Sequence, residues 1–517
     1  MEELQRLQVS DLAHLAPELT LVITAIVLSL LDLFLPSRVN RNFVGWLSLV
    51  GIAISALFVA LDIRELNPID EATGLLTSLE PVRLLGESFR IDDFANLFKL
   101  LLLTGTALIV LMSLGSVKDE DIQHKGEFYY LFLPAVVGAM VMASSGDLIT
   151  LFVGLELLSI TSYIMVGMRK KHLASNESAF KYVVLGGISS AIILYGMSFL
   201  YGITGSTNIS EINIAISGDY ATFEPIIYLA FFLLLAGFGF KIAAAPFHMW
   251  APDVYEGAPT PVTAFLAVVS KAAAFALAFR VLYSVFALGS FLQSDIHEDI
   301  FLAVAVLAAI AMIVGNAVAL RQVSLKRLLA YSGVANAGYL LVPISTGYDI
   351  VHYSNFSEFF FYLIAYLFMN IGIIAIFMMV SNSTKNEEIS AFAGLYYRAP
   401  GTAVAAVILI LSLAGLPITG GFFGKLYILL GTLQVHDYWL AAILIGTSVI
   451  SFYYYFGIIR QMFMRSTYTE SEFQCTLPQQ ITVWICAAAT VAMGIFPGYV
   501  LRWIESIVSL SNDFFIR

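Results

Sequence analysis

The stretch Leu233–Val262, LLLAGFGFKIAAAPFHMWAPDVYEGAPTPV, decides the fold. It begins as an apolar membrane segment, but Lys241 lies in its middle and Pro246 follows five residues later. A lysine near the bilayer centre costs a few kcal/mol or more. Proline removes a backbone donor, so the helix must bend or unwind there, and an unwound turn at membrane depth needs protein or water around it. A charge beside a broken helix therefore predicts an ion path. The alternative is a helix end whose lysine reaches for the lipid headgroups.

The composition indicates a polytopic membrane protein built as one helical bundle. Of the 517 residues, 59% are hydrophobic and 12% are charged, whereas soluble domains carry about twice that charged fraction. Only two cysteines are present, Cys475 and Cys486, and they give no metal or disulfide framework. The first sixteen residues are polar and acidic, so we expect no cleavable signal peptide.

Apolar runs of about 20 residues, the length of a membrane span, predict an all-α protein with fourteen transmembrane helices. The expected spans are 17–36, 42–61, 94–114, 128–145, 148–168, 178–202, 226–250, 261–287, 300–320, 328–345, 359–380, 402–432, 438–459 and 479–504. The twelfth is too long for one straight helix. The acidic loop 62–93 is expected to fold over the surface as a turn or hairpin.

Two of the spans resemble each other. The seventh contains LLLAGFGFKIAAAPF and the twelfth LSLAGLPITGGFFGKLY, and both combine Leu-Ala-Gly, a proline, further glycines and a lysine. A seventh and a twelfth helix cross the membrane in opposite directions, so the match predicts two inverted repeats of five helices, with helices seven and twelve broken. The expected divisions are 1–127 (helices one to three), 128–287 (helices four to eight), 300–465 (helices nine to thirteen) and 466–517 (helix fourteen).

The lysines and arginines of the loops predict the orientation. With the N-terminus outside, the inner loops hold fifteen of these residues and the outer side holds six, while five lie within spans. Because positive residues concentrate on the cytoplasmic side, we expect both termini on the outer face of the membrane.

Four ionisable residues are predicted at mid-depth: Glu156 in span five, Lys241 in span seven, Lys271 in span eight and Lys425 in span twelve. Desolvation favours a neutral lysine and a nearby carboxylate favours a charged one. A glutamate that moves relative to a lysine can therefore load and unload a proton. His248, just after the break in span seven, could extend such a relay.

Structural alternatives stand beside each of these assignments. Glu156 and Lys241 could form a static ion pair that locks two helices together. Lys271 could be satisfied by the backbone carbonyls of a neighbouring broken helix, and His248 could serve packing. We expect Lys99 and Arg280, nearer the ends of their spans, to snorkel toward the interface.

Further polar residues allow two interpretations. Four on span ten, Tyr331, Ser332, Asn336 and Tyr339, could line a hydrated route, but interhelical hydrogen bonding is the favoured interpretation. In the loop after the first break, Asp253 and Glu256 have no basic residue between Trp250 and Lys271. They predict either an acidic mouth that draws in protons or caps for the next helix.

No redox or phosphate-binding motif is visible in the sequence. It contains no phosphate-cradling glycine loop, no cysteine cluster for iron–sulfur and no paired histidines suited to haem. We therefore expect no electron carrier bound to this chain, so that ion movement is driven by a partner or by an opposing gradient.

Three runs carry a resemblance to a known family: PFHMWAPDVYEGAPTPVTAFL at 246–266, SAFKYVVLGGISSAIILYG at 178–196 and LAGLPITGGFFGK at 413–425. They resemble the subunit N family of bacterial NADH:quinone oxidoreductase, respiratory complex I, and the similarity extends over essentially the whole chain. The resemblance implies fourteen helices with inverted repeats and proton pumping driven by quinone reduction elsewhere in the complex. The chain would then be part of a translocase in the bacterial cell membrane.

The resemblance also implies roles and partners. By motif position, the family's proton-carrying residues fall on Glu156, Lys241, Lys271, Lys425 and His248. No cofactor is expected in this chain, since NADH, FMN, iron–sulfur clusters and quinone are used by partner subunits. The expected partners are the other membrane and peripheral subunits of the complex and the lipid bilayer, with no nucleic acid.

Two other classes remain open. A cation/proton antiporter subunit of the Mrp type shares the fold and the buried charges, although the EGAPTPV motif after the first break favours subunit N. A purely structural membrane scaffold is disfavoured by four intramembrane ionisable groups.

Overall fold

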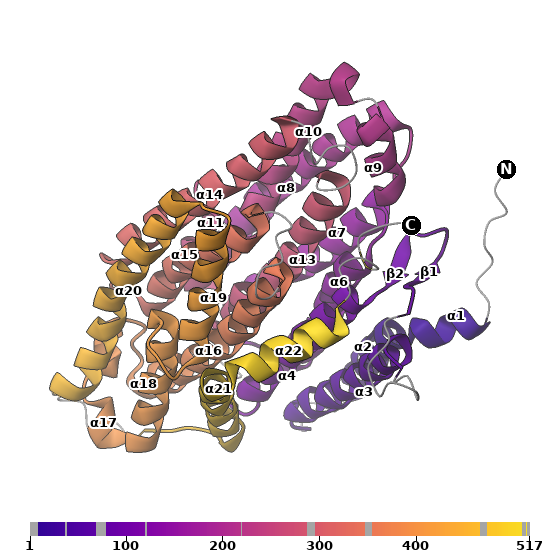
Figure 1. The fold of residues 1–517 in the computed structure, drawn as a ribbon. Coiled ribbons are helices and arrows are strands. Elements are labelled where there is room, and N and C mark those ends of the chain that lie inside the picture. The colour runs from indigo at the N-terminus through magenta and orange to yellow at the C-terminus, as the bar shows by residue number, and fades with distance from the viewer. Residues whose placement is uncertain are drawn as a thin grey trace.

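The computed structural model describes residues 9–36, 39–68, 79–118, 121–218, 220–286, 295–346, 354–465, 473–508 and 513. Within them, thirteen helices are long and apolar enough to cross a membrane. They pack side by side into one elongated bundle (Figure 1). The prediction of a polytopic helical membrane protein is confirmed.

The chain begins with four helices, the first three at one edge of the bundle and the fourth buried inside it (Figure 1). These are α1 Val9–His14, α2 Ala16–Phe34, α3 Asn42–Leu66 and, after the loop, α4 Asp93–Ser113. The predicted hairpin is present as the antiparallel strands β1 Val82–Leu84 and β2 Phe89–Ile91. The described chain is mostly helical, as the all-α class predicts, with this one short two-stranded sheet in the loop. Residues 69–78 of the same loop lie outside the described residues.

The middle of the chain supplies the first set of packed helices. They are α5 Lys125–Tyr130, α6 Phe132–Ser144, α7 Leu148–Val166, α8 Leu173–Thr204, α9 Ile209–Gly218, α10 Tyr220–Lys241, α11 Trp250–Gly257, α12 Thr260–Phe265, the π-helix η1 Leu266–Ser270, α13 Lys271–Val281 and the π-helix η2 Leu282–Phe286. The tight connection between α6 and α7 works because Asp147 caps α7, its Oδ1 accepting from the backbone N–H of Ile149 at 2.7 Å.

The remaining helices form the second set and the C-terminal part. They are α14 Asp295–Ala319, α15 Leu325–Ser345, α16 Asn355–Thr384, the 3₁₀-helix η4 Ile389–Phe392, α17 Leu395–Arg398, α18 Pro400–Ala414, α19 Gly420–Gln434, α20 Tyr438–Met464, α21 Leu477–Ile495 and α22 Pro497–Ile507. The last predicted span, 479–504, is too long. Helix α21 ends at Ile495, and Pro497 starts the separate helix α22, which crosses the face of the bundle (Figure 1).

Both predicted breaks are present. Helix α10 ends at Lys241 and the chain continues as α11 after the turn that contains Pro246. Helix α18 ends at Ala414 and α19 begins at Gly420, with Gly415 between them at φ +85°. Each half of this second break has only 15 residues, which is why thirteen long helices are found rather than fourteen.

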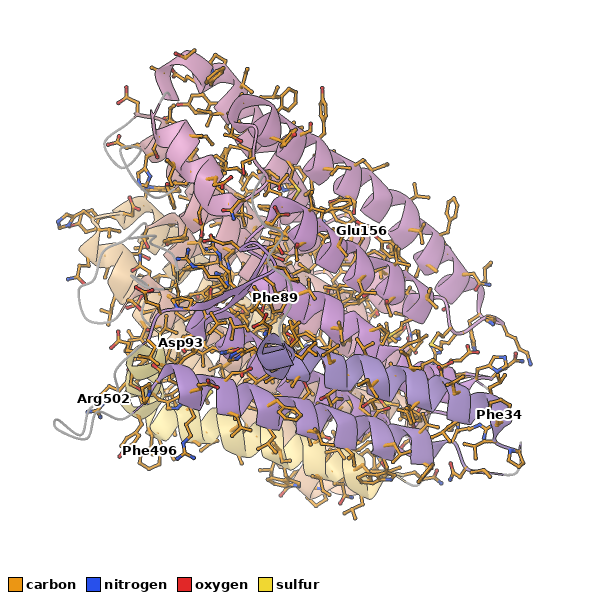
Figure 2. All side chains as sticks on the ribbon, turned by 90° about the vertical axis from the view of Figure 1, so that its right-hand side faces the viewer. Phe34, Phe89, Asp93, Glu156, Phe496 and Arg502 are labelled. Atoms are coloured by element: carbon orange, nitrogen blue, oxygen red, sulfur yellow. The ribbon has the colours of Figure 1, made fainter. Side chains whose placement is uncertain are left out.

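The two ends of the bundle can be told apart by labelled residues. Phe34 lies at one end, whereas Phe89, Asp93, Phe496 and Arg502 lie toward the other (Figure 2). We call the second end, which carries β1, β2 and the first turn of α4, the hairpin end. Glu156 lies between the two ends, consistent with a position well inside the membrane (Figure 2).

Arg280 and Lys99 do not snorkel, contrary to the sequence-based expectation. Arg280 is fully buried, and its guanidinium binds both carboxylate oxygens of Asp92, with Nη2 to Oδ1 at 2.9 Å. Lys99 is equally buried, and its Nζ lies 2.9 Å from Oε1 of Glu18. A buried cation needs a partner, and each carboxylate comes from the start of another helix at the hairpin end.

The Arg280–Asp92 pair predicts a stability effect. Arg280→Met leaves a buried carboxylate without its cation, which costs about 3–5 kcal/mol. Arg280→Met combined with Asp92→Asn removes both charges and should recover much of the loss. Thermal unfolding of the purified protein in detergent measures this, with the exposed Arg321→Met as the control. Equal stability of Arg280→Met and wild type would contradict the assignment.

Candidate functional site

Lys241 ends α10 at the first break and is held by hydroxyl groups. Its Nζ donates to Oγ of Ser159 on α7 at 2.8 Å and to Oγ of Ser190 on α8 at 3.3 Å. Glu156 lies on α7, one turn before Ser159, and its Oε1 is buried without a hydrogen-bond partner in the protein. No ion pair joins Glu156 to Lys241 among the described residues, so the static ion pair is not formed. The two groups interact electrostatically across the gap.

His248 lies within the first break and faces the second set of helices. Its ring is buried and meets the ring of Tyr331 on α15 edge to face, with centroids 5.9 Å apart. Trp250 closes the same break, because its Nε1–H donates to the carbonyl of Phe240 at 2.9 Å. The break is thus stabilised by side chains, and His248 contacts α15 through Tyr331.

Lys271 lies at the centre, where the two sets of helices meet. It follows the π-helix η1 directly and is almost fully buried. Its Nζ donates to the carbonyl of Gly333 on α15 at 2.6 Å and lies 5.7 Å from the ring centroid of Tyr366 on α16. The expected carbonyl partner is therefore present, although it belongs to a continuous helix and not to a broken one.

Lys425 is built into the second break. Its Nζ donates to the carbonyls of Leu413 at 3.1 Å and Ala414 at 3.4 Å, and it lies 4.8 Å from the ring centroid of Tyr339. Those carbonyls are the last of α18, where the helix dipole is negative. The cation and the broken helix end therefore stabilise each other.

A hydrogen-bonded network of polar side chains involves α15, the helix that contacts both Lys271, through Gly333, and Lys425, through Tyr339. Asn336 is central: its Nδ2 donates to the carbonyl of Ser332 at 2.8 Å, and its Oδ1 accepts from the hydroxyl of Tyr362. Four further side-chain hydrogen bonds belong to this network: Ser332 with Tyr455, Tyr339 with Thr447 at 3.2 Å, Asn316 with Tyr339 at 3.1 Å, and Tyr454 with Asn316 at 3.0 Å. The interhelical interpretation of Ser332, Asn336 and Tyr339 is confirmed.

Lys241, which is half-buried, and the buried Lys271 and Lys425 share one electrostatic feature. Within the described residues, each is held by neutral oxygens, and none has a carboxylate within ion-pair distance. Loss of a proton from any of them therefore breaks no ion pair among the described residues. Hydroxyl and amide groups that bridge the helices can carry a proton between such sites, with water where the protein chain is interrupted.

The segment after the first break, which is the helix α11 and not a loop, is not an acidic mouth. Asp253 binds Nζ of Lys181 and Nη1 of Arg327, each at 2.7 Å, and Glu256 binds Nη1 of Arg327 at 2.9 Å. Partial burial alone would raise the pKa of Asp253, but the hydrogen bonds from Lys181 and Arg327 outweigh it and lower the pKa below its ordinary value. Capping is wrong as well, since α12 has no side-chain cap.

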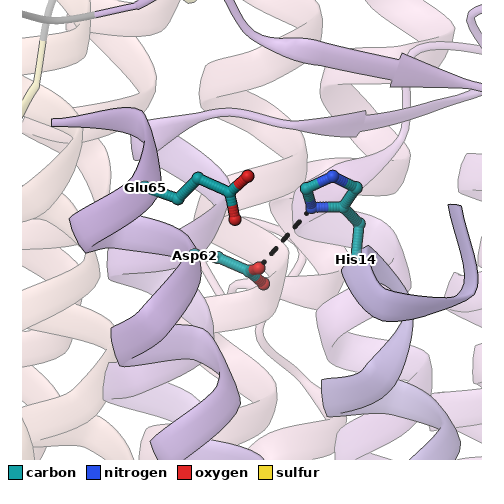
Figure 3. Close-up of side chains that lie close together, drawn as sticks. All are labelled: His14, Asp62 and Glu65. Atoms are coloured by element: carbon teal, nitrogen blue, oxygen red, sulfur yellow. Dashed lines mark ion pairs between the residues drawn. The ribbon is translucent and has the colours of Figure 1, made fainter. Parts of the chain in front are cut away.

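A second charged cluster, only partly buried, lies at the hairpin end. His14 Nδ1 lies 3.7 Å from Oδ1 of Asp62, with Glu65 beside them (Figure 3), and the Glu18–Lys99 pair lies close by. Sequence reasoning missed this cluster because its members stand at span ends, where charged residues are ordinary. Glu18 and Lys99 carry opposite charges near the starts of the expected spans 17–36 and 94–114. Their similar expected depth was a sign that they could pair.

Comparisons with known proteins identify relatives over the whole length. The family model for the transmembrane part of NADH:quinone oxidoreductases and Mrp antiporters matches residues 145–451. NADH-quinone oxidoreductase subunit N of Paenibacillus sp. (strain JDR-2) is 52% identical and covers 100% of both chains. A chain of respiratory complex I from Thermus thermophilus with bound aureothin is 31% identical, with a TM-score of 0.77, and the match covers 95% of this chain and 99% of that one.

The fold is also shared more widely. A chain of the Mrp complex from Dietzia sp. DQ12-45-1b has a TM-score of 0.81 at 17% identity, and the match covers 96% of this chain and 97% of that one. At that identity the likeness shows the common fold alone.

The Asp253 cluster predicts a pH-independent contribution to stability between pH 5 and pH 7. Asp253→Asn with Glu256→Gln removes partly exposed pairs, which are worth about 1–2 kcal/mol together. The pKa of Asp253 is lower in the folded protein than in the unfolded one. The stabilisation is therefore fully present at pH above the unfolded-state pKa, and it is lost only as the pH falls through the folded-state pKa. Unfolding of wild type and the double variant at both pH values measures the difference, with Glu298→Gln at an exposed position as control. A difference that vanished at pH 5 would contradict this.

Proposed function

The chain belongs to the subunit N family of NADH-quinone oxidoreductases, and we propose that it is the subunit of such a translocase that moves protons across the membrane. The observation that carries the proposal is the set of three lysines inside the helical bundle: Lys271 and Lys425 are buried and Lys241 is half-buried. Two of them are built into helix breaks, and all three are held by neutral groups. Ionisable residues kept at this depth mark ion pathways.

Electron transfer belongs to partner subunits in this proposal. NADH, FMN, the iron–sulfur clusters and quinone act there, and this chain contributes proton-carrying side chains only. The partners are the other membrane and peripheral subunits, and the surrounding medium is the lipid bilayer of the bacterial cell. The full-length similarity to a complex I chain supports this assembly.

Each site residue has a proposed role. Lys241 holds the proton of the first half of the path, and Glu156 changes the affinity of Lys241 for it. His248 passes the proton toward Lys271, and Lys425 holds the proton of the second half. Moving a carboxylate from about 8 Å to about 4 Å from a lysine changes their attraction by about 2 kcal/mol at an effective dielectric constant near 20. Transporting one proton against about 150 mV takes about 3.5 kcal/mol, so the two energies are of the same order.

We also propose how the observed helices group into membrane crossings and repeats. Joining α18 and α19 into one broken span gives fourteen crossings, with inverted five-helix repeats at 128–287 and 300–465, helices one to three at 1–127 and helix fourteen within 466–517. The distribution of basic residues supports an orientation with the hairpin end and both termini outward. An Mrp-type antiporter subunit is the alternative, and the 52% identity to a subunit N favours complex I.

Removing the first pair tests the function. Lys241→Ala, or Glu156→Ala, should reduce NADH-driven proton uptake by inside-out membrane vesicles by about tenfold or more, as expected when a proton-transfer group is lost. The complex should still assemble, because Lys241 forms no ion pair. Lys171→Ala in an exposed loop is the control. Wild-type uptake in both Lys241→Ala and Glu156→Ala would assign the two residues a structural role only.

Gly333 tests the central lysine without altering a charge. A Cβ there would lie 3.0 Å from Nζ of Lys271 and 3.3 Å from the hydroxyl of Tyr366, so the amine must move off the Gly333 carbonyl. We expect Gly333→Ala to lower proton uptake per NADH oxidised while assembly is retained. Gly187→Ala on α8, where nothing lies within 4 Å of the added Cβ, is the matched control. An equal small effect of both changes would argue against a role for this contact.

A further inference from the structure

Glu358, in the first turn of α16, is a buried carboxylate that the mechanism above does not use. Only 3% of the residue is exposed, and within the described chain no hydrogen bond or ion pair reaches its carboxylate. A structural carboxylate in this protein looks different: Asp92 is also buried, but it caps α4 and binds Arg280. An acid kept in a membrane bundle without such partners calls for a functional explanation.

The position of Glu358 connects it to the second half of the path. Helices α16 and α19 pack closely enough that a Cβ on Gly424 would lie 2.4 Å from Cδ2 of Tyr362, and one on Gly431 would lie 2.6 Å from Oε2 of Glu358. Glu358 therefore points at the same helix that carries Lys425. It lies one helical turn from Tyr362, whose hydroxyl donates to Asn336 in the network described above.

A second carboxylate lies between Glu358 and the surface. Glu505 on α22 is partly exposed, and its Oε1 accepts from the backbone N–H of Ser354 at 2.9 Å, just before α16 begins. It is the charged group whose field acts on Glu358. The two acids therefore form a pair at the hairpin end, in which Glu358 is buried and Glu505 is partly exposed to solvent.

We propose that Glu358 is the exit carboxylate of this protein: it accepts a proton arriving from Lys425 and the Asn336–Tyr362 network and passes it to Glu505 at the hairpin end. The step transfers a proton only. The lysine becomes neutral, the Glu358 carboxylate becomes a neutral acid, and the proton then moves to Glu505 and to water. The repulsion between the two carboxylates favours binding of one proton and release of the next. The inference rests on the proposed function and names where its path ends.

Substitutions that keep the shape of the side chain test this in the assembled complex. Glu358→Gln removes the titratable group with little change in volume, and we expect NADH-driven proton uptake by vesicles to fall about tenfold or more. Glu358→Asp keeps the carboxylate and should retain a substantial part of the uptake. Glu505→Gln should have a smaller effect, because water reaches that position directly. Glu65→Gln, an exposed acid at the same end, is the control.

The outcomes separate this inference from the function it rests on. If Lys241→Ala loses uptake while Glu358→Gln pumps like wild type, the exit assignment is wrong and the proposed function stands. If neither variant changes uptake, the proposed function itself fails. Equal losses in Glu358→Gln and Glu358→Asp, in complexes assembled to the same level, would show that Glu358 acts through packing and would also overturn the inference.

Discussion

The structure depends on how the polar groups freed by a helix break are satisfied inside a membrane. Breaking α18 exposes the carbonyls of Leu413 and Ala414, and the amine of Lys425 binds both. At the other break, the indole of Trp250 takes the carbonyl of Phe240. Neither a bare carbonyl nor a bare ammonium is tolerated in hydrocarbon. At the second break the lysine and the freed carbonyls satisfy each other, and at the first break Lys241 is held by the hydroxyl groups of Ser159 and Ser190. Neither arrangement uses a carboxylate, which leaves the lysine free to change its charge.

That constraint explains why the broken helices and their lysines could be predicted from the sequence. A lysine five to eight residues from a proline in an apolar run has few stable solutions, so Lys241 and Lys425 could be placed at breaks from the local pattern alone. The membrane class, the hairpin and most spans follow from hydropathy and length in the same way. The end of α21 was misjudged because apolar residues continue past Pro497 into α22.

Partners distant in the chain could not be predicted. Arg280 meets Asp92 across 188 residues, and Asp253 meets Arg327 across 74, so a single sequence offers no sign of either pair. The snorkelling of Arg280 and the acidic mouth at Asp253 were wrong for this one reason. Glu358 escaped notice differently: it stands at a span end among phenylalanines, and only the packing of α19 against α16 shows that it is buried.

The central claim is that protons pass through Lys271, where the two sets of helices meet. It is tested most directly by the number of protons translocated per NADH oxidised in complexes that carry Lys271→Met, which removes the charge at similar volume, compared with wild type at equal assembly. The account predicts a lower ratio, because the network around Asn336 and Lys425 is then cut off from Lys241. An unchanged ratio would contradict it.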